Sequence, residues 1–220
     1  MNTKRRHIKR RHTRYNMCEN IAKIAYINLD ERPDRKEEIE KELESYGLVP
    51  NERFKGIKFE YPRGIVGCGY AHLNVLKEAR EKRYKNILIF EDDFEFFVSK
   101  EAFDGLMRRV FDDKVEFDVI MLAYNLQVYE ESDYDYLYKV NKAHTASGYL
   151  VNESMYDELI ELYEWAIPKL DETLEHWIYA NDQIWVSLMC RKNWYCFKER
   201  VGRQRASHSD NTNTFADYGI

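Results

Sequence analysis

A chain of 220 residues with 44% hydrophobic and 33% charged residues has the composition of a folded globular domain, which excludes a largely disordered protein. The formal net charge is −5, yet residues 1–18 carry seven Lys or Arg and no acid. The remaining residues therefore hold 27 basic and 39 acidic side chains, a balance of −12. An acidic body of this kind argues against extended contact with nucleic acid.

Two further patterns bear on location. No run of about 18 apolar residues predicts a membrane span, and no apolar segment follows the basic N-terminus as a secretory signal requires. The four cysteines show no CxxC spacing, so we expect reduced thiols in a cytoplasmic protein, without a zinc site or disulfide framework. Residues 1–20 are expected to form a disordered basic arm. That arm could bind nucleic acid or an acidic surface, or act as a localisation signal, but a solvated tail is favoured.

The folded part is predicted to begin with a strand over residues 21–29, IAKIAYINL. Pro33 suits the first turn of a following helix, and Gly47 suits the position just past its end. A second strand is expected over 54–59. Strand, helix and strand in this order open a βαβ arrangement, so we expect one α/β domain over residues 21–220.

The glycine-rich segment 64–70, GIVGCGY, is predicted to be a turn that leads into a helix with an apolar face at Ala71, Val75 and Ala79. Its glycines match neither the dinucleotide fingerprint nor the phosphate-binding P-loop. They would let backbone N–H groups approach an anion, and a plain turn is an equal alternative. A short apolar run at 87–90 then predicts a strand buried on both faces.

Later elements follow the same alternation of strands and helices. Helices are expected at 103–111, at 153–165 with an Asn152 cap, and at 182–190 with an Asn181 cap, and Pro168 is expected to interrupt the helical pattern. Strands are expected at 117–124, at the end of 144–151 and at 194–197, with a loop and an edge strand within 129–140. Residues 202–220 have the composition of a polar tail.

Three acids, Glu91, Asp92 and Asp93, directly follow the predicted strand at 87–90. In open α/β sheets, ligands bind beyond the carboxyl ends of strands. Carboxylates that share a partly dry site repel one another, and a divalent cation such as Mg²⁺ or Mn²⁺ relieves that repulsion. The alternative is a charged turn that caps the strand.

Three segments resemble, in order, the motifs of the glycosyltransferase family 25 domain. They are YINLDERPDR at residues 26–35, GCGYAH at 67–72 and LIFEDD at 88–93. The family includes lipooligosaccharide galactosyltransferases and collagen hydroxylysine galactosyltransferases, and the resemblance covers roughly residues 21–210. It implies a GT-A type fold, a Rossmann-like α/β/α sandwich with a mixed, mostly parallel central sheet.

The resemblance also implies a nucleotide-sugar donor at the end of the first strand. Asn28, Leu29 and Asp30 would face the base or ribose, and Arg32 or Arg35 would reach the diphosphate or remain a solvated charge. Transfer would move galactose or glucose from a UDP-sugar to a saccharide or hydroxylysine-type hydroxyl. No contact with nucleic acid is expected.

A Mn²⁺ or Mg²⁺ ion would neutralise the departing diphosphate. Asp93 is expected to be a direct ligand and Glu91 a second ligand or a ribose contact, while Asp92 would lie at the donor or bond the backbone. This sequence has Glu91 where a strict DxD motif has Asp. In the polar tail, His208 is expected to be a third metal ligand, with Asp210 close to it.

Inverting transfer needs a base for the acceptor hydroxyl. Asp182 is the candidate base, and Asp118 and Asp210 are its rivals. His72 and His144 are candidate contacts to donor or acceptor, although buried or surface histidines without a catalytic role are common. Two other classes remain open: a metal-dependent phosphohydrolase or nucleotidyltransferase that uses the same acids, and a non-catalytic sugar- or nucleotide-binding module.

Overall fold

The computed structural model describes residues 19–209 and 214–216. Apart from its last two positions, the predicted arm at residues 1–20 lies outside the described residues, as does Asp210. An eight-stranded sheet in the order β2-β1-β3-β8-β5-β9-β7-β6 runs through the molecule. Its strands are β1 (Ile24–Asn28), β2 (Glu52–Lys55), β3 (Asn86–Glu91), β5 (Val119–Met121), β6 (Asn125–Glu131), β7 (Leu137–His144), β8 (Gly148–Asn152) and β9 (Trp194–Phe197).

Six of the eight strands point the same way. β1 pairs in parallel with β2 and β3, and β5 pairs in parallel with β9. Only β8 and β7 run against the others, β8 between β3 and β5, and β7 between β9 and β6. The predicted mixed, mostly parallel α/β sheet is therefore confirmed.

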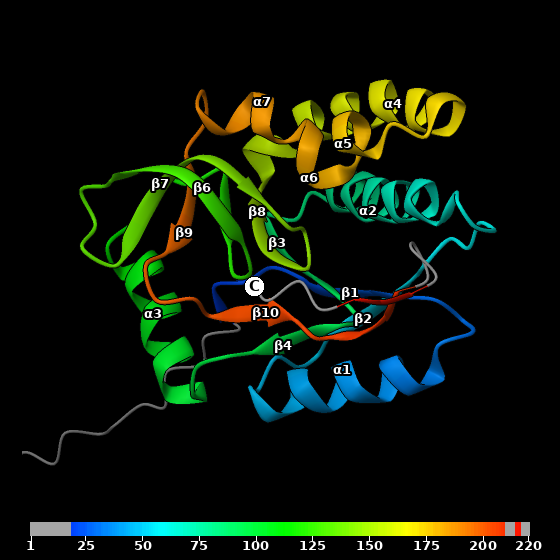
Figure 1. Cartoon of the computed structure of the whole chain (residues 1–220). Helices are drawn as coiled ribbons and strands as arrows, with labels where there is room; N and C mark the ends of the chain where they lie inside the picture. The colour runs from blue at the N-terminus through cyan, green and yellow to red at the C-terminus, as the bar shows by residue number, and fades with distance from the viewer. Residues whose placement is uncertain (1–18, 210–213, 217–220) are drawn as a thin grey trace, which may run out of the picture.

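Helices cover both faces of the sheet (Figure 1). On one face lie α1 (Pro33–Ser45) and α3 (Lys100–Asp112); on the other lie α2 (Gly64–Glu81), α4 (Tyr156–Thr173), α5 (His176–Tyr179), α6 (Asn181–Ile184) and α7 (Val186–Met189). Two separate apolar cores result. Ile39, Leu43 and Phe103 belong to one core, and Val75 and Ile167 belong to the other. None of the helices described is long and apolar enough to cross a membrane.

The first βαβ unit follows its sequence signals closely. All five residues of β1 are buried, as expected for a strand covered on both faces. Pro33 opens α1, and Gly47 follows its end with a φ of +71°, a conformation that glycine adopts without strain. The second strand, β2, begins two residues earlier than predicted and ends at Lys55.

The glycine-rich segment is not a turn that precedes a helix, because α2 already begins at Gly64. Its glycines permit close packing of the helix. A Cβ on Gly67 would lie 1.8 Å from the carbonyl oxygen of Ile57, and one on Gly69 would lie 3.1 Å from Ile167 of α4. The prediction of a turn was wrong because glycine at a helix contact and glycine at a turn look alike in sequence.

Two helix boundaries also differ from prediction. α4 continues through Pro168 to Thr173, because Ile167 and Leu170 on either side are buried and tertiary packing outweighs the missing backbone N–H. Asn181 does not cap the next helix. Ala180 is the N-cap, and the buried Asn181 donates from Nδ2 to the Sγ atom of Cys68 at 3.2 Å.

The segment predicted as a loop with an edge strand forms an antiparallel hairpin of β6 and β7, with β6 at the edge of the sheet. Residues 202–209 are likewise more ordered than a polar tail. Strand β10 (Gly202–Gln204) pairs with β4 (Phe94–Phe96), directly after the acids, and β11 (Ser207–Ser209) pairs with β12 (Thr214–Ala216). Late residues therefore return to the end of β3.

Candidate active site

The candidate site lies where β1 and β3 end side by side. Because the two strands are parallel, Ile27 lies opposite Glu91, and both carboxyl ends meet at one edge. Strand β8 begins at this edge, with Gly148 opposite Phe90, and the N–H of Glu91 donates to the carbonyl of Ser147. The loop before β8 therefore borders the acids.

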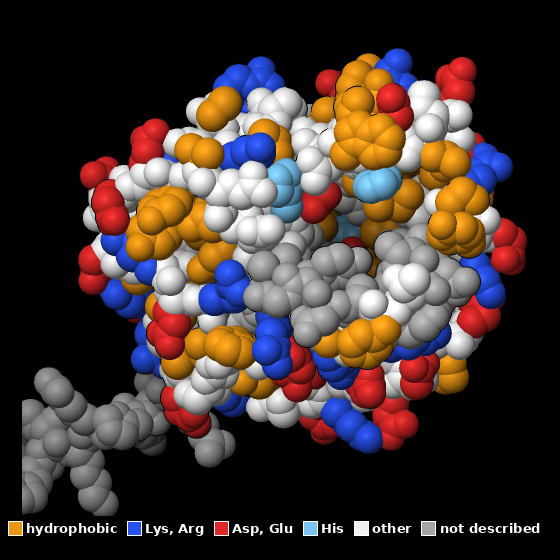
Figure 2. Space-filling model, viewed as in Figure 1, with side chains coloured by type: hydrophobic (Ala, Val, Ile, Leu, Met, Phe, Trp, Pro, Cys, Tyr) orange, Lys and Arg blue, Asp and Glu red, His pale blue; other side chains and the backbone are white. Residues whose placement is uncertain are grey.

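A cavity of about 360 Å³ opens at this edge. Figure 2 shows a hollow on this face, with acidic and histidine side chains around it. Its lining combines the ends of β1 and β3, the loop between β2 and α2, the first turns of α2, and one residue each from α1 and β10. These residues are Ile27, Asn28, Leu29, Arg35, Gly56, Ile57, Lys58, Phe59, Glu60, Tyr61, Gly64, Cys68, Ala71, Glu91, Asp92, Asp93 and Gln204.

Arg35 joins two of the three acids. Its Nη1 atom lies 2.9 Å from Oδ1 of Asp92 and 3.1 Å from Oδ2 of Asp93, and all three side chains are buried. Arg35 therefore forms ion pairs with the acids themselves, and its contact with a diphosphate stays a prediction. One guanidinium among three carboxylates leaves the group with two excess negative charges.

Asn28 holds the end of β1 against this group. Its Nδ2 donates to Oδ2 of Asp92 at 2.7 Å and to the carbonyl of Arg32 at 3.0 Å, while its Oδ1 accepts from Nε of Arg53 at 3.0 Å. These bonds occupy both ends of the amide. Leu29 lines the cavity, but Asp30 does not, because Arg53 and Lys55 hold its carboxylate at the surface. The ribose role of Asp30 thus remains a prediction without a geometric basis.

Asp93 has an unusual environment for a carboxylate. Oδ2 accepts from Arg35 and, at 3.1 Å, from Nε2 of Gln204, whereas Oδ1 is buried and has no hydrogen-bond partner among the described residues. Burial raises the pKa of Asp93 to about 7, with a further contribution from the nearby Glu91 charge. The backbone of Arg205 also holds this turn, because its N–H donates to the Asp93 carbonyl at 2.7 Å.

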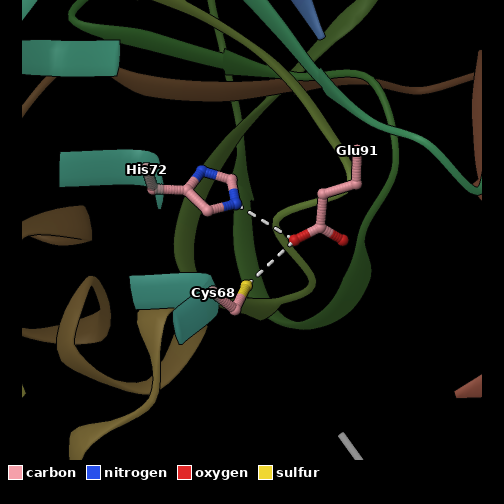
Figure 3. A group of neighbouring side chains, drawn as sticks. All are labelled: Cys68, His72 and Glu91. Atoms are coloured by element: carbon pink, nitrogen blue, oxygen red, sulfur yellow. Dashed lines mark hydrogen bonds and ion pairs between the residues drawn. The ribbon is translucent and has the colours of Figure 1, made fainter. Parts of the chain in front are cut away.

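Glu91 points toward Cys68 and His72 of α2 (Figure 3). Its Oε1 lies 3.0 Å from Nε2 of His72 and 3.5 Å from Sγ of Cys68, which are one helical turn apart. Burial favours a raised pKa for Glu91, but the bonds with His72 and Cys68 and the charges of His72 and Arg35 together outweigh burial and lower the pKa. Burial also raises the pKa of Cys68 well above its usual value, so its sulfur carries a proton in the absence of a cation.

His72 is fully buried, and its second nitrogen, Nδ1, lies 2.6 Å from the hydroxyl of Tyr149. In the neutral ring, the hydroxyl donates to Nδ1 while Nε2–H donates to the Glu91 carboxylate. His72 is not part of the cavity lining and reaches it through Glu91. Its direct contact with a donor stays a prediction.

The candidate base, Asp182, lies in the first turn of α6, outside the cavity lining. Its Oδ2 accepts from the N–H of Thr145 at 3.0 Å and lies 4.0 Å from Nδ1 of His144. Thr145 has a φ of +88°, a strained conformation for a β-branched residue, and strain of this kind concentrates at functional sites. Thr145 also belongs to the loop that borders Glu91, so Asp182 is tied to the same edge of the sheet.

The rival Asp118 does not belong to this site. It immediately precedes β5 and so lies at the opposite edge of the sheet, where it bonds Ser154 and the backbone of Asn193. The proposed third ligand, His208, has its backbone in β11, but its side chain lies outside the described part of the chain. Asp210 lies outside it entirely.

Sequence reasoning missed three residues of the site. Cys68 precedes His72 by four residues on a helix, a spacing that places both on one face, so this contact could have been found. Gln204 and Arg205 carried no local signal, because only the pairing of β10 with β4 brings them to Asp93.

No family model matches this sequence, and no curated protein sequence matches it either. The likeness to family 25 therefore rests on its short motifs alone. Solved structures with a similar chain path include a glycosyltransferase involved in the glycosylation of the major capsid of PBCV-1, with 7% identity over 87% of this chain and 96% of that chain, and a TM-score of 0.49. Mannose-1-phosphate geranyltransferase from Thermus thermophilus has 10% identity over 84% and 75%, with a TM-score of 0.47. A197 from STIV has 12% identity over 84% and 95%, with a TM-score of 0.42. These similarities are too weak to indicate an activity.

Proposed function

We propose that this protein is a metal-dependent, inverting glycosyltransferase that moves a hexose from a UDP-sugar to a hydroxyl acceptor. One observation carries the proposal: a buried carboxylate oxygen, Oδ1 of Asp93, has no hydrogen-bond partner within residues 19–209 and 214–216 and belongs to an acidic group that lines a cavity. A buried polar atom without a partner is costly unless a ligand satisfies it. A divalent cation would satisfy it and offset the two excess negative charges.

The donor set suits Mn²⁺ or Mg²⁺, because carboxylate oxygens are the preferred ligands of both ions. Asp93 and Glu91 would hold the ion, and Arg35 and Gln204 would keep the Asp93 carboxylate oriented. When bound, the ion would neutralise the negative charge that a departing diphosphate gains.

The cavity has the size and walls expected for a nucleotide. Its volume of about 360 Å³ falls in the range of small-molecule sites, which is roughly 300–1,000 Å³. Phe59 and Tyr61, in the loop between β2 and α2, offer aromatic surface for a base, and Ile27 and Leu29 offer backbone groups at the end of β1. The transferred sugar would then lie on the Glu91 side.

The acceptor would approach from the side of α6. Asp182 would accept the proton of the acceptor hydroxyl, while the N–H of Thr145 keeps its carboxylate in place. The side chains of Asp182 and His144 are partly exposed, at 27% and 15%, so an acceptor can reach them from solvent. A saccharide hydroxyl and a hydroxylysine-type hydroxyl both meet this requirement.

The test is a panel of nucleotide sugars, including UDP-galactose and UDP-glucose, incubated with the protein and Mn²⁺ while free nucleoside diphosphate is measured. We expect slow hydrolysis of one UDP-sugar, its loss on chelation, and acceleration by a suitable acceptor. Release of nucleoside monophosphate or inorganic phosphate would instead identify a phosphohydrolase or nucleotidyltransferase. Binding without any release would identify a non-catalytic module.

A further inference from the structure

Cys68, His72 and Glu91 form a group of three different ligand types at the wall of the cavity (Figure 3). One potential ligand atom from each residue lies within 4.8 Å of the other two. Cys68 and His72 come from successive turns of α2, and Glu91 comes from the end of β3. Helix α2 and strand β3, which both have buried faces, therefore fix the backbone positions of all three residues.

The spacing of these atoms suits a small tetrahedral ion. Glu91 Oε1 lies 3.0 Å from His72 Nε2 and 3.5 Å from Cys68 Sγ. At the usual Zn–N, Zn–O and Zn–S bond lengths, two ligands of a tetrahedral zinc lie about 3.3–3.7 Å apart. The two contacts of Glu91 therefore need shifts of only a few tenths of an ångström to accommodate an ion, and the ligand atoms of Cys68 and His72 lie within 4.8 Å of each other.

Surrounding residues already orient the ligands. Tyr149 holds Nδ1 of His72 at 2.6 Å, which directs Nε2 toward Glu91. Asn181 donates to Sγ of Cys68 at 3.2 Å, and a donor at this position stabilises a thiolate. Metal-binding histidines commonly have their second nitrogen held in this way.

We propose that Cys68, His72 and Glu91 form a zinc site whose fourth coordination position opens into the cavity. A thiolate and an imidazole favour Zn²⁺ over Mn²⁺ or Mg²⁺. Cys68 and Glu91 line the cavity, so water or an anionic oxygen can take the fourth position, as in zinc sites that keep one position open. On binding, the thiol proton leaves to solvent, and the histidine proton moves from Nε2 to Nδ1, where the Nδ1–H group donates a hydrogen bond to the Tyr149 hydroxyl oxygen.

The zinc ligands share only Glu91 with the proposed metal ligands of the transfer site, although Cys68 lines the same cavity. Asp93 is not one of the three ligands, and Arg35 and Gln204 engage it instead. Zinc binding can therefore be measured without donor or acceptor, and its result does not depend on whether the protein transfers a sugar.

The test uses Co²⁺ as a spectroscopic substitute for Zn²⁺ on the full chain without nucleotide sugar. We expect a thiolate-to-cobalt charge-transfer band in the near ultraviolet and intense visible bands of a tetrahedral ion, both of which Zn²⁺ removes stoichiometrically. Cys68→Ser should abolish the charge-transfer band and weaken Zn²⁺ binding by about 100-fold or more, since even loss of an outer contact to a metal ligand costs 10- to 100-fold. Cys190→Ser is the matched control, because this thiol is exposed and distant in sequence from the three ligands.

Two further variants sharpen the result. His72→Gln should reduce Zn²⁺ affinity to a similar extent, and Cys68→Ser alone decides the matter if the buried His72 variant does not fold. Asp93→Asn should keep the cobalt spectrum even though it abolishes transfer under the proposed function. Absence of a charge-transfer band in the wild-type protein, or its persistence in Cys68→Ser, would overturn the zinc site.

Discussion

Gln204 donates from Nε2 to Oδ2 of Asp93 at 3.1 Å, although 111 residues separate them along the chain. The pairing of β10 with β4 produces this contact, because Gln204 lies opposite Phe94, the residue after Asp93. The pairing therefore holds the late strand β10 beside the turn that carries the acids. This gives Asp93 one neutral and one cationic hydrogen-bond donor, while Oδ1 has no partner in the part of the chain that the structure describes.

Asp93→Asn should abolish metal-dependent transfer and leave the fold intact. In the absence of metal, the melting temperature at pH 8 should hold or rise, because the variant removes a buried charge beside Glu91. Thermal unfolding in the presence of a chelator, with transfer assays at saturating Mn²⁺, measures both effects. Turnover equal to wild type would end the assignment of Asp93 as a metal ligand.

The pH dependence of that difference has a defined sign. The pKa of Asp93 is about 7 in the folded protein, against about 3.9 in an unfolded chain. Between these values the folded state binds more protons, so this group lowers stability as pH rises from about 4 to 7. The stability gained by Asp93→Asn should thus be larger at pH 8 than at pH 4, and Asp133→Asn, at an exposed acid, should show no such trend.

Arg35→Met should be strongly destabilising. The guanidinium pairs with both Asp92 and Asp93, and its loss leaves buried carboxylates without their cation. Breaking a buried pair from one side costs about 3–5 kcal/mol. Lys36→Met on the same helix removes a 44% exposed ammonium 3.8 Å from Glu40, and should change the free energy of unfolding by less than about 1 kcal/mol. Denaturant titration of both variants tests this contrast, and equal effects would contradict it.

Gly67→Ala should displace the loop that forms one wall of the cavity. Its Cβ would lie 1.8 Å from the Ile57 carbonyl oxygen, so the loop or α2 must shift, at a cost of about 1–3 kcal/mol or more. We expect the affinity for UDP to fall together with the free energy of unfolding. Gly105→Ala, in α3 with no atom within 4 Å of the added carbon, should instead stabilise by about 0.5–1 kcal/mol. Calorimetry and UDP titration of the two alanine variants provide the comparison.

Asp182→Asn should lower kcat for transfer by about 10²- to 10⁴-fold, the usual contribution of a general base. The Asn oxygen can still accept from Thr145, so UDP affinity and stability should change little. Asp118→Asn is the control at the opposite edge of the sheet, where an amide oxygen can no longer accept from both Ser154 and Asn193 as the two carboxylate oxygens do, which should affect stability but not kcat. Similar kcat values for Asp182→Asn and wild type would assign the base elsewhere.

Local signals were sufficient where one short segment decides the outcome. The apolar run at 87–90 with acids after it, and Pro33 and Gly47 around the first helix, each report a preference that neighbouring residues alone satisfy. The α/β class and the position of the acids at a strand end follow from these signals. They are properties of backbone conformation and burial that the sequence encodes locally.

Where distant segments meet, the sequence determined little. The glycines at 64–70 were interpreted as a turn because nothing local reveals that Ile57 and Ile167 press against them. Pro168 was expected to interrupt a helix that burial of its neighbours sustains.

The sequence by itself therefore determined the βαβ opening, the buried strand and the acids at its end. Only the tertiary structure decided what those acids contact: Arg35 for Asp92 and Asp93, His72 and Cys68 for Glu91, and Gln204 from the late strand β10. The physical reason is that hydrogen bonds and close packing depend on distances between remote segments, such as the 111 residues that separate Gln204 from Asp93, which strand pairing fixes and no local pattern records.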